Sequence, residues 1–428
     1  MRRIIAEDPD WSLAQVPYLS KLCLQTIMKN IGALPIYDQL SPTEQMFLQE
    51  KLPLTAPLTV TANLIPDGVY WQRRCNELWD LCDVLDYGKS WKRMFFERYL
   101  EGLIELFIPG ASEPRSVLAM VPLCKNYVQR LNITQLLPPI KEAPREEEEE
   151  RFDLNSPEDD DRPTLDRFNF SILLEKLVRL EEVHLKYTVK QCGMNFERGM
   201  FEMTRKDCET LAQALKSCKT LKVLHLYLSV VNDGQCRLLV KNLLDHPSLT
   251  ELDFSFNVIS DRGARAISKL LSRSKLQILN LYGNNIGDHG AKAIAHALST
   301  NSTLEHLSLG GNCVGDEGGQ YLANALLKNT CLKTLDLRGN DVAEQTARAV
   351  SNLLIHNSTL THIRLVNTKL GVEGGKALRE AMSQNTSVTE LDVTLTGMEE
   401  KDVDLINEML WANEERPRLR QQQGDSVE

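Results

Sequence analysis

The sequence predicts a protein of the α/β class, in which a solenoid of stacked repeats follows a smaller helical domain. The main observation is the phrase L-x-x-L-x-L-x-x-N, whose copies recur in the C-terminal half of the 428-residue chain. These copies are spaced 27 or 28 residues apart and begin at Leu221, Leu249, Leu276, Leu304, Leu332, Leu360 and Val388. Apolar residues at helical spacing follow each phrase. A fixed period of this length indicates one strand–helix unit stacked on itself.

Residues 1–140 are expected to form the N-terminal helical domain. Ser41 to Glu44 fit a helix start, because serine can cap the first turn and Glu44 can reach back to Ser41 as in a capping box. Pro42 suits the first helical position. A second helix is expected from Ser90 to Phe107, and the wide apolar face of this segment indicates that it is well buried.

Residues 141–163 are expected to be an acidic flexible linker. This segment has 4 basic and 11 acidic residues, so it carries −7 of the net charge of −10. Like charges repel, and little apolar surface is present to drive folding. A solvated spacer is the simplest interpretation, and binding to a basic partner is the alternative.

Residues 164–220 are expected to hold an irregular first repeat with a loop insertion. Leu180, Val183 and Leu185 match the phrase and indicate a strand at the edge of the sheet. The next phrase starts 41 residues after Leu180, so about a dozen residues are inserted as a surface loop that includes residues 192–196.

Residues 221–415 are expected to be leucine-rich repeats with a C-terminal cap. The last helix, with Ile406 and Trp411, should cover the open end of the stack. Pro417 is expected to end this helix, and residues 416–428 are expected to be a disordered tail.

The repeat residues have separate structural roles. Leucines at the fourth and sixth positions should point into the stack from a short strand. Asparagines at the ninth position are expected to form a ladder of hydrogen bonds to buried backbone groups, at Asn257, Asn284, Asn312 and Asn340. A second set follows the helices and is expected to adopt the left-handed conformation, at Asn301, Asn329, Asn357 and Asn385.

The strand residues between the leucines should face the concave side of the solenoid as a mixed polar strip. Tyrosine and arginine are favoured at binding hot spots. For any single residue, the alternative is an ordinary solvated sheet face. The hypothesis assigns protein binding to His225, Tyr227, Asp253, Asn280, Tyr282, His306, Asp336, Arg338, His362, Arg364 and Asp392.

The sequence carries no motif that indicates catalysis. It contains no phosphate-binding loop, no dinucleotide-binding glycine pattern, no H-E-x-x-H and no nucleophile elbow. Its ten cysteines include no C-x-x-C pair and are expected to be reduced thiols in the cytosol. No apolar run is long enough to span a membrane, and the near-neutral folded parts do not suggest nucleic-acid binding. The chain is therefore expected not to be an enzyme and to use no cofactor or metal.

The repeat helices, with Asp261-Arg262-Gly263-Ala264-Arg265-Ala266-Ile267 as an example, resemble the ribonuclease-inhibitor class of leucine-rich repeat. This resemblance covers residues 221–415. It implies a horseshoe with parallel strands inside and helices outside, and it is specific for fold and not for function.

Six further phrases follow one another over nearly the whole chain. The strongest is Ser90-Trp91-Lys92-Arg93-Met94-Phe95-Phe96-Glu97-Arg98. The others lie at residues 3–13, 60–65, 192–196, 243–247 and 261–265. Together these phrases resemble the T-complex-associated testis-expressed protein 1 family, which is subunit 5 of the nexin–dynein regulatory complex.

This resemblance implies a non-catalytic structural subunit of motile cilia and sperm flagella. The complex bridges doublet microtubules and helps regulate dynein-driven bending. The implied partners are its other subunits, including a second leucine-rich subunit that resembles F-box proteins, with indirect contact to the doublet microtubules. The implied location is the cytoplasm, in the cytoskeleton of the axoneme. The alternative function is that of a cytosolic adaptor, such as a ubiquitin-ligase substrate receptor or a small-GTPase regulator.

Overall fold

The computed structural model describes residues 18–33, 36–108, 114–137, 167–190, 192 and 198–424. The chain divides into two compact units. The first comprises Met1–Tyr99 and Pro122–Tyr127, and the second comprises Leu100–Val121 and Val128–Glu428. The acidic linker at 141–163, the inserted residues 193–197 and the last four residues of the tail lie outside the described residues.

The first unit is helical. Its elements are α1 (Leu19–Lys29), η1 (Tyr37–Gln39), α2 (Pro42–Lys51), α3 (Leu58–Leu64), α4 (Val69–Leu78), η2 (Leu85–Tyr87) and the start of α5 (Trp91–Glu105). The predicted capping box is confirmed, since the backbone N–H of Ser41 donates to the Glu44 carboxylate at 2.9 Å. The predicted start of α5 is also confirmed, because Ser90 Oγ accepts the N–H of Arg93 at 3.1 Å.

Aromatic side chains form the core of the first unit. Trp71 is fully buried, and its ring centroid lies 5.1 Å from that of Phe95 and 5.2 Å from that of Phe96. Lys92 is buried beside them, where its Nζ donates to the carbonyl of Ile65 at 2.8 Å. The phrase from Ser90 to Arg98 is therefore partly a packing motif of this unit.

The second unit contains a nine-stranded parallel sheet whose strands follow chain order. Adjacent strands pair the same phrase positions, as in Leu252 with Leu279. The leucines expected to point into the stack, such as Leu279 and Leu281, are buried. The strands are β1 (Arg130–Ile133), β2 (Glu182–Leu185), β3 (Val223–Leu226), β4 (Glu251–Asp253), β5 (Ile278–Asn280), β6 (His306–Ser308), β7 (Thr334–Asp336), β8 (His362–Arg364) and β9 (Glu390–Asp392).

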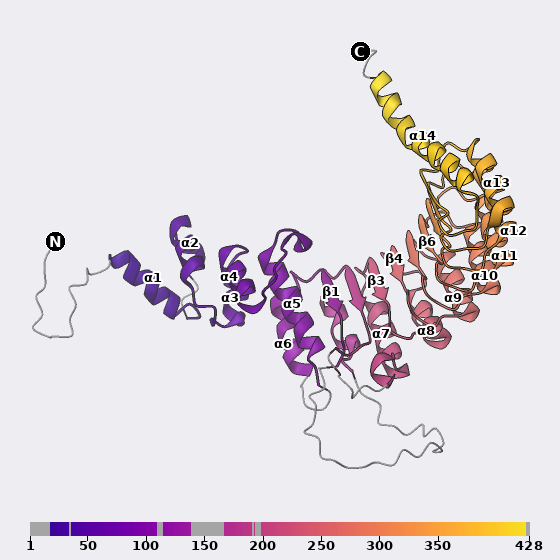
Figure 1. Ribbon diagram of the computed structural model, residues 1–428. Helices are drawn as coiled ribbons and strands as arrows, with labels where there is room; N and C mark the ends of the chain where they lie inside the picture. The colour runs from indigo at the N-terminus through magenta and orange to yellow at the C-terminus, as the bar shows by residue number, and fades with distance from the viewer. Residues whose placement is uncertain are drawn as a thin grey trace, which may run out of the picture. The chain divides into compact units, whose positions relative to one another are not determined.

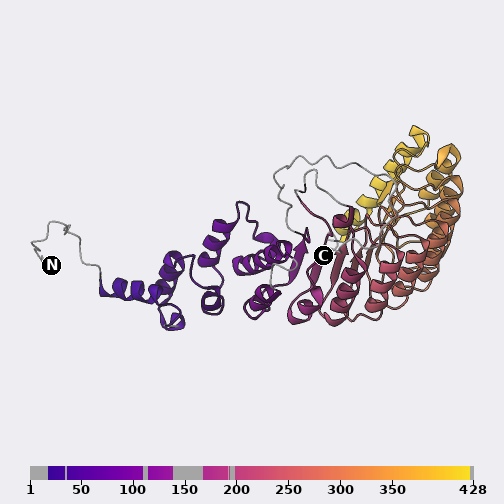
Figure 2. The same cartoon turned by 90° about the horizontal axis from the view of Figure 1, so that it is seen from below.

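A helix follows each strand from β3 onward. Figures 1 and 2 show the strands along the inner side of the curved array and the helices along its outer side. The predicted α/β solenoid with a preceding helical region is confirmed. The remaining elements are α6 (Pro114–Cys124), η3 (Phe170–Ile172), η4 (Leu174–Lys176), η5 (Arg198–Phe201), α7 (Arg205–Ser217), α8 (Asp233–Leu243), α9 (Asp261–Leu271), α10 (Asp288–Leu298), α11 (Asp316–Leu326), α12 (Glu344–His356), α13 (Gly371–Met382) and α14 (Glu400–Gly424).

The sheet begins earlier in the chain than expected. Strand β1 pairs with β2, with Leu131 opposite Val183, so β1 and not β2 is the edge strand of the described sheet. Its residues match the phrase at Val128, Leu131 and Ile133, all buried, with Leu136 at the ladder position. Because the linker and other residues separate β1 from β2, the repeat period is interrupted there.

The C-terminal helix α14 continues to Gly424, so the expectation that Pro417 ends it is wrong. A proline inside a helix removes only one backbone hydrogen bond, and the backbone remains helical on both sides of Pro417. Ile406 on this helix is fully buried, whereas Trp411 is 68% exposed.

The ninth residue of the phrase connects neighbouring repeats through its side chain. Asn312 Oδ1 accepts the N–H of Ile286 from the preceding repeat at 3.0 Å. Its Nδ2 donates at 2.9 Å to the carbonyls of Leu281 and Leu309. The same contacts to a preceding repeat occur at Asn257, Asn284 and Asn340. All four asparagines are buried, so they satisfy backbone groups that would be costly to leave unpaired.

The asparagines that follow the helices are not left-handed, so that prediction is wrong. Asn357 has a φ of −103°, and none of the set has a positive φ. Their side chains instead form a second ladder. Asn357 Nδ2 donates to the carbonyl of Leu326 at 3.0 Å, and its Oδ1 accepts the N–H of Leu360 at 2.9 Å. One side chain thus closes its own turn and reaches the preceding repeat.

His246 takes the place of this asparagine in the turn between α8 and β4. Its Nε2 lies 2.9 Å from the carbonyl oxygen of Cys218, and its Nδ1 accepts the N–H of Leu249 at 3.2 Å. One nitrogen must donate and the other must accept, so the site requires a neutral imidazole. Burial lowers the pKa of His246 accordingly.

Acidification is expected to destabilise the array through His246. Its folded pKa lies below the unfolded value of about 6.5, so the unfolded state takes up more protons as the pH falls. The contribution of neutral His246 to the free energy of unfolding is therefore fully present above about pH 6.5, and it is lost as the pH falls towards the folded pKa. Melting temperatures between pH 7.5 and 5.5 should decline less in His246→Asn than in the wild type. The exposed His296→Asn is the control, and an equal decline in all three proteins would contradict the expectation.

Aspartates at the helix starts form a third ladder, which the sequence analysis did not predict. Asp261 Oδ1 accepts the N–H groups of Gly287 at 2.8 Å and Gly290 at 2.9 Å. The aspartate therefore caps the helix of the next repeat, because Gly287 cannot cap that helix itself. The same arrangement occurs at Asp233, Asp288 and Asp316.

Candidate protein-binding surface

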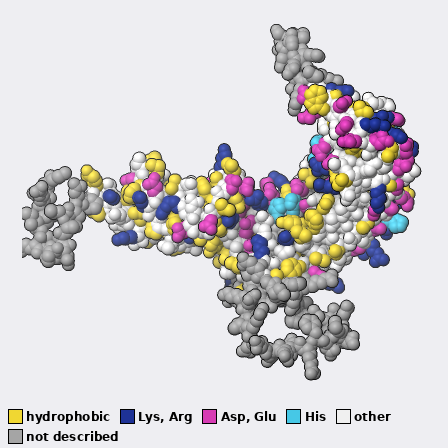
Figure 3. Space-filling view, in the orientation of Figure 1, with side chains coloured by type: hydrophobic (Ala, Val, Ile, Leu, Met, Phe, Trp, Pro, Cys, Tyr) yellow, Lys and Arg dark blue, Asp and Glu magenta, His cyan; other side chains and the backbone are white. Residues whose placement is uncertain are grey.

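Along each strand, alternate side chains are buried and the others lie on the concave side of the array. Figure 3 shows acidic, basic, histidine and hydrophobic side chains intermixed on this side. At β2 and β3 the rings of His184 and His225 lie 4.3 Å apart, and His225 Nε2 lies 2.7 Å from Glu251 Oε1. Burial, and then the charge of His225, lower the pKa of His184.

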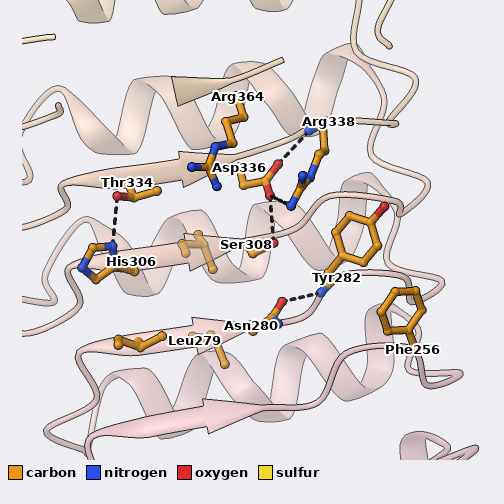
Figure 4. Close-up of a pocket in the computed structure, with 12 residues that line it drawn as sticks. Phe256, Leu279, Asn280, Tyr282, His306, Ser308, Thr334, Asp336, Arg338 and Arg364 are labelled. Carbon is orange, nitrogen blue, oxygen red and sulfur yellow. Dashed lines mark hydrogen bonds and ion pairs between the residues drawn. The ribbon is translucent and has the colours of Figure 1, made fainter. Parts of the chain in front are cut away.

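Six candidate residues line one cavity of about 640 Å³ on the concave face between β4 and β8. They are Asn280, Tyr282, His306, Asp336, Arg338 and Arg364, and Figure 4 shows them with their neighbours. Asp253 adjoins this group, since its Oδ2 accepts a hydrogen bond from Asn280 Nδ2 at 2.7 Å. Asp253 is not itself part of the lining, and the other four candidates outside it are His225 and Tyr227 from the β3 repeat, His362 on β8 and Asp392 on β9.

The aspartate and arginine side chains of the cavity each have an ionic partner, within the lining or next to it. Asp336 is only 3% exposed, and its Oδ2 lies 3.0 Å from a terminal nitrogen of Arg338 and 3.3 Å from Ser308 Oγ. Arg364 Nε donates to Glu390 at 2.7 Å, and this hydrogen bond raises the pKa of the arginine. On the opposite side, His306 Nδ1 lies 2.9 Å from the hydroxyl of Thr334.

An aromatic pair borders the cavity. The ring of Phe256 lies 5.2 Å from that of Tyr282, and the guanidinium of Arg338 lies 5.1 Å from the Tyr282 ring. Arg338 thus contacts both the carboxylate of Asp336 and the ring of Tyr282 on this side of the cavity.

Phe256 was missed by the sequence analysis. It is 50% exposed and has a φ of +53°, a left-handed conformation that costs a residue other than glycine about 1–2 kcal/mol. Its phrase position, just before the ladder asparagine, is left-handed in every repeat from β3 to β9. The residues are Leu228, Phe256, Gly283, Gly311, Gly339, Asn367 and Leu395. Glycine occupies this position in three of these repeats, which was the available sequence signal that the position is left-handed. A large apolar residue such as Phe256 is therefore held there in a strained conformation and points outward.

The described residues show no group of three or more metal-ligating side chains, and no helix among them could cross a membrane. Burial raises the pKa of Cys75, Cys124 and Cys208 to about 12, so these thiols are poor nucleophiles. The cavity combines paired charges with the exposed ring of Phe256 and the partly buried ring of Tyr282. Such a surface suits recognition of a protein chain.

A family model described as "Leucine Rich repeat" matches residues 245–268, 274–295, 300–323, 328–344 and 356–378. Three similar curated proteins are named "Dynein regulatory complex subunit 5". The protein from Mus musculus is 49% identical over 63% of this chain and 54% of its own length. That from Macaca fascicularis is 46% identical over 71% of this chain and 61% of its own length. That from Chlamydomonas reinhardtii is 32% identical over 51% of this chain and 50% of its own length.

The chain thus spans between half and two thirds of the length of these curated relatives. A solved structure described as "Leiomodin-1 Actin-Binding Site 2 (ABS2)" matches 32% of this chain and 79% of its own, with 18% identity and a TM-score of 0.29. A likeness this low carries no argument about function. The chain is therefore a leucine-rich repeat protein whose curated homologues are named "Dynein regulatory complex subunit 5".

Proposed function

We propose that this chain is a non-catalytic scaffold subunit of a dynein regulatory complex in the axoneme of motile cilia and flagella, including the sperm flagellum. The sequence identity of 46–49% to proteins named for that complex, over 63–71% of this chain, carries the proposal. The proposed partners are other subunits of the complex, among them a leucine-rich F-box-like subunit. Contact with doublet microtubules would be indirect.

The repeat array offers the physical means for such a role. Its ladders join successive repeats by side-chain hydrogen bonds, so the concave face is held in one shape. A preordered surface loses less conformational entropy when it binds a partner.

The concave cavity is the proposed contact for another subunit. Replacing both Tyr282 and Arg338 by alanine is expected to reduce co-purification of the other subunits from axonemes by about ten-fold or more, as loss of a hot spot does. The variant would be expressed in ciliated cells that lack the endogenous protein, and subunits would be quantified by mass spectrometry.

The matched control replaces Tyr321 and Arg348, which lie on the outer helices α11 and α12, by alanine. Co-purification should remain at the wild-type level in this control. Wild-type incorporation of the concave variant would refute the proposed contact. Absence of the wild-type protein from axonemes, or its recovery with a ubiquitin-ligase adaptor instead, would refute the proposed function itself.

A further inference from the structure

A groove on the outer side of the array, distinct from the concave cavity, is lined by five cationic side chains. It lies between α8 and α9 and has a volume of about 580 Å³. The cations are Arg237, Lys241, Arg262, Arg265 and Lys269, and the other lining residues are Val240, Leu244 and Ala266. No acidic residue belongs to the lining.

The helical spacing explains how five cations come to share one groove. Arg237 and Lys241 are four residues apart on α8, so they lie on one face of that helix. Arg262, Arg265 and Lys269 are three and four residues apart on α9 and form the facing row. All five are exposed, whereas Val240 between the rows is buried. The groove therefore has charged walls and an apolar floor.

None of these five cations has a side-chain ion pair or hydrogen bond within the part of the chain that the structure describes. Nearby Arg273, in contrast, pairs with Asp245. The aspartates that begin the two helices are already engaged, since Asp233 accepts the N–H of Gly263 at 2.9 Å and Asp261 accepts that of Gly287 at 2.8 Å. Outer cations in other repeats do have partners, as Arg205 with Glu209, Arg348 with Glu344 and Lys376 with Glu373.

Fold stability does not account for such a cluster. Like charges at this helical spacing destabilise a helix by a few tenths of a kcal/mol per pair. The chain as a whole carries a net charge of −10, so the local charge of this cluster of unpaired cations is opposite in sign to the net charge of the protein. An anionic ligand would relieve the repulsion between the two rows.

We infer that the α8–α9 groove binds a glutamate-rich segment of a partner protein. Each helix has 11 residues and is therefore about 16 Å long, which an extended peptide of about five or six residues would span. Arginine forks pair bidentately with carboxylates, and the apolar floor can contact the methylene groups of glutamate. The lining contains no aromatic side chain on which a nucleobase could stack, which disfavours a nucleic acid.

The inference can be tested by fluorescence anisotropy with the full chain and a labelled oligoglutamate peptide of about eight residues. Binding is expected at about 50 mM salt and should weaken steeply by about 200 mM, because the contact is between exposed charges. Lys241→Glu combined with Lys269→Glu is expected to weaken binding by about ten-fold or more. Circular dichroism melting would establish that the variant remains folded.

The matched control is Lys275→Glu combined with Lys328→Glu, which changes the net charge equally at exposed lysines outside the groove. It should weaken binding by less than about two-fold. Equal weakening by both pairs would show diffuse attraction and overturn the site. Tighter binding of a single-stranded oligonucleotide than of oligoglutamate would also overturn it. Binding that appears only after Glu146–Glu150 are replaced by serine would assign the groove to the chain's own acidic segment and would equally refute a partner ligand.

Discussion

Replacing Asn312 by alanine is expected to lower the free energy of unfolding by about 3 kcal/mol, the upper part of the range for buried polar groups left unpaired. The amide of Asn312 serves two repeats at once. Its Oδ1 accepts from Ile286, and its Nδ2 donates to Leu281, Leu309 and Gly310. Because Asn312 is buried, water cannot replace these bonds without opening the stack.

Urea unfolding followed by circular dichroism would measure this effect. Asn324→Ala is the matched control, since Asn324 is exposed on the helix of the same repeat and should change stability by less than about 0.5 kcal/mol. Asn340→Ala should resemble Asn312→Ala, because Asn340 makes the corresponding bonds one repeat later. An unfolding curve of Asn312→Ala that overlays the wild type would show that the ladder contributes nothing to stability.

The parts of the fold that were predictable are those encoded at a fixed distance along the chain. A 28-residue step places Leu307 beside Leu335 and Leu335 beside Ile363, so strand pairing follows from counting. The helix start at Ser41 was also predictable, because both partners of its capping box lie within four residues. In each case the two interacting groups are separated by a fixed number of residues, so the pair can be recognised from the sequence alone.

Features that depend on contacts between repeats were not predictable in the same way. Strand β1 matches the phrase, but the interrupted spacing before β2 hides its membership in the sheet. From its position after a helix, Asn357 is expected only to end that helix. Its hydrogen bond to the carbonyl of Leu326 depends on how the preceding repeat is stacked. The cavity depends on the curvature of the stack, which brings Phe256 and Arg338 to either side of Tyr282.

The aspartate ladder provides the second large expected effect. Replacing Asp316 by alanine is expected to lower the free energy of unfolding by about 2–3 kcal/mol, since charge-assisted hydrogen bonds at a helix start are among the stronger ones. Asp316 Oδ1 accepts the N–H of Ala343 at 2.7 Å, the N–H of Thr346 at 2.9 Å and the hydroxyl of Thr346 at 2.7 Å. Thr346 is fully buried, so its hydroxyl would be left with only the more distant backbone carbonyl of residue 316, at 3.4 Å, as an acceptor.

The pH dependence distinguishes this role from simple packing. Desolvation raises the pKa of Asp316, but hydrogen bonds from Thr346 and Ala343 outweigh it, and the pKa is lowered overall. The carboxylate therefore contributes stability that is present above the unfolded pKa of about 4 and is lost as the pH falls through the folded pKa. The stability gap between wild type and Asp316→Ala should be full at pH 7 and should narrow in acid. The control is Glu317→Ala, at an exposed neighbour on the same helix turn. Its free energy of unfolding should differ from that of the wild type by less than about 0.5 kcal/mol at either pH. A gap for Asp316→Ala that stays constant between pH 7 and acid would mean that the carboxylate charge does not hold the next helix in place.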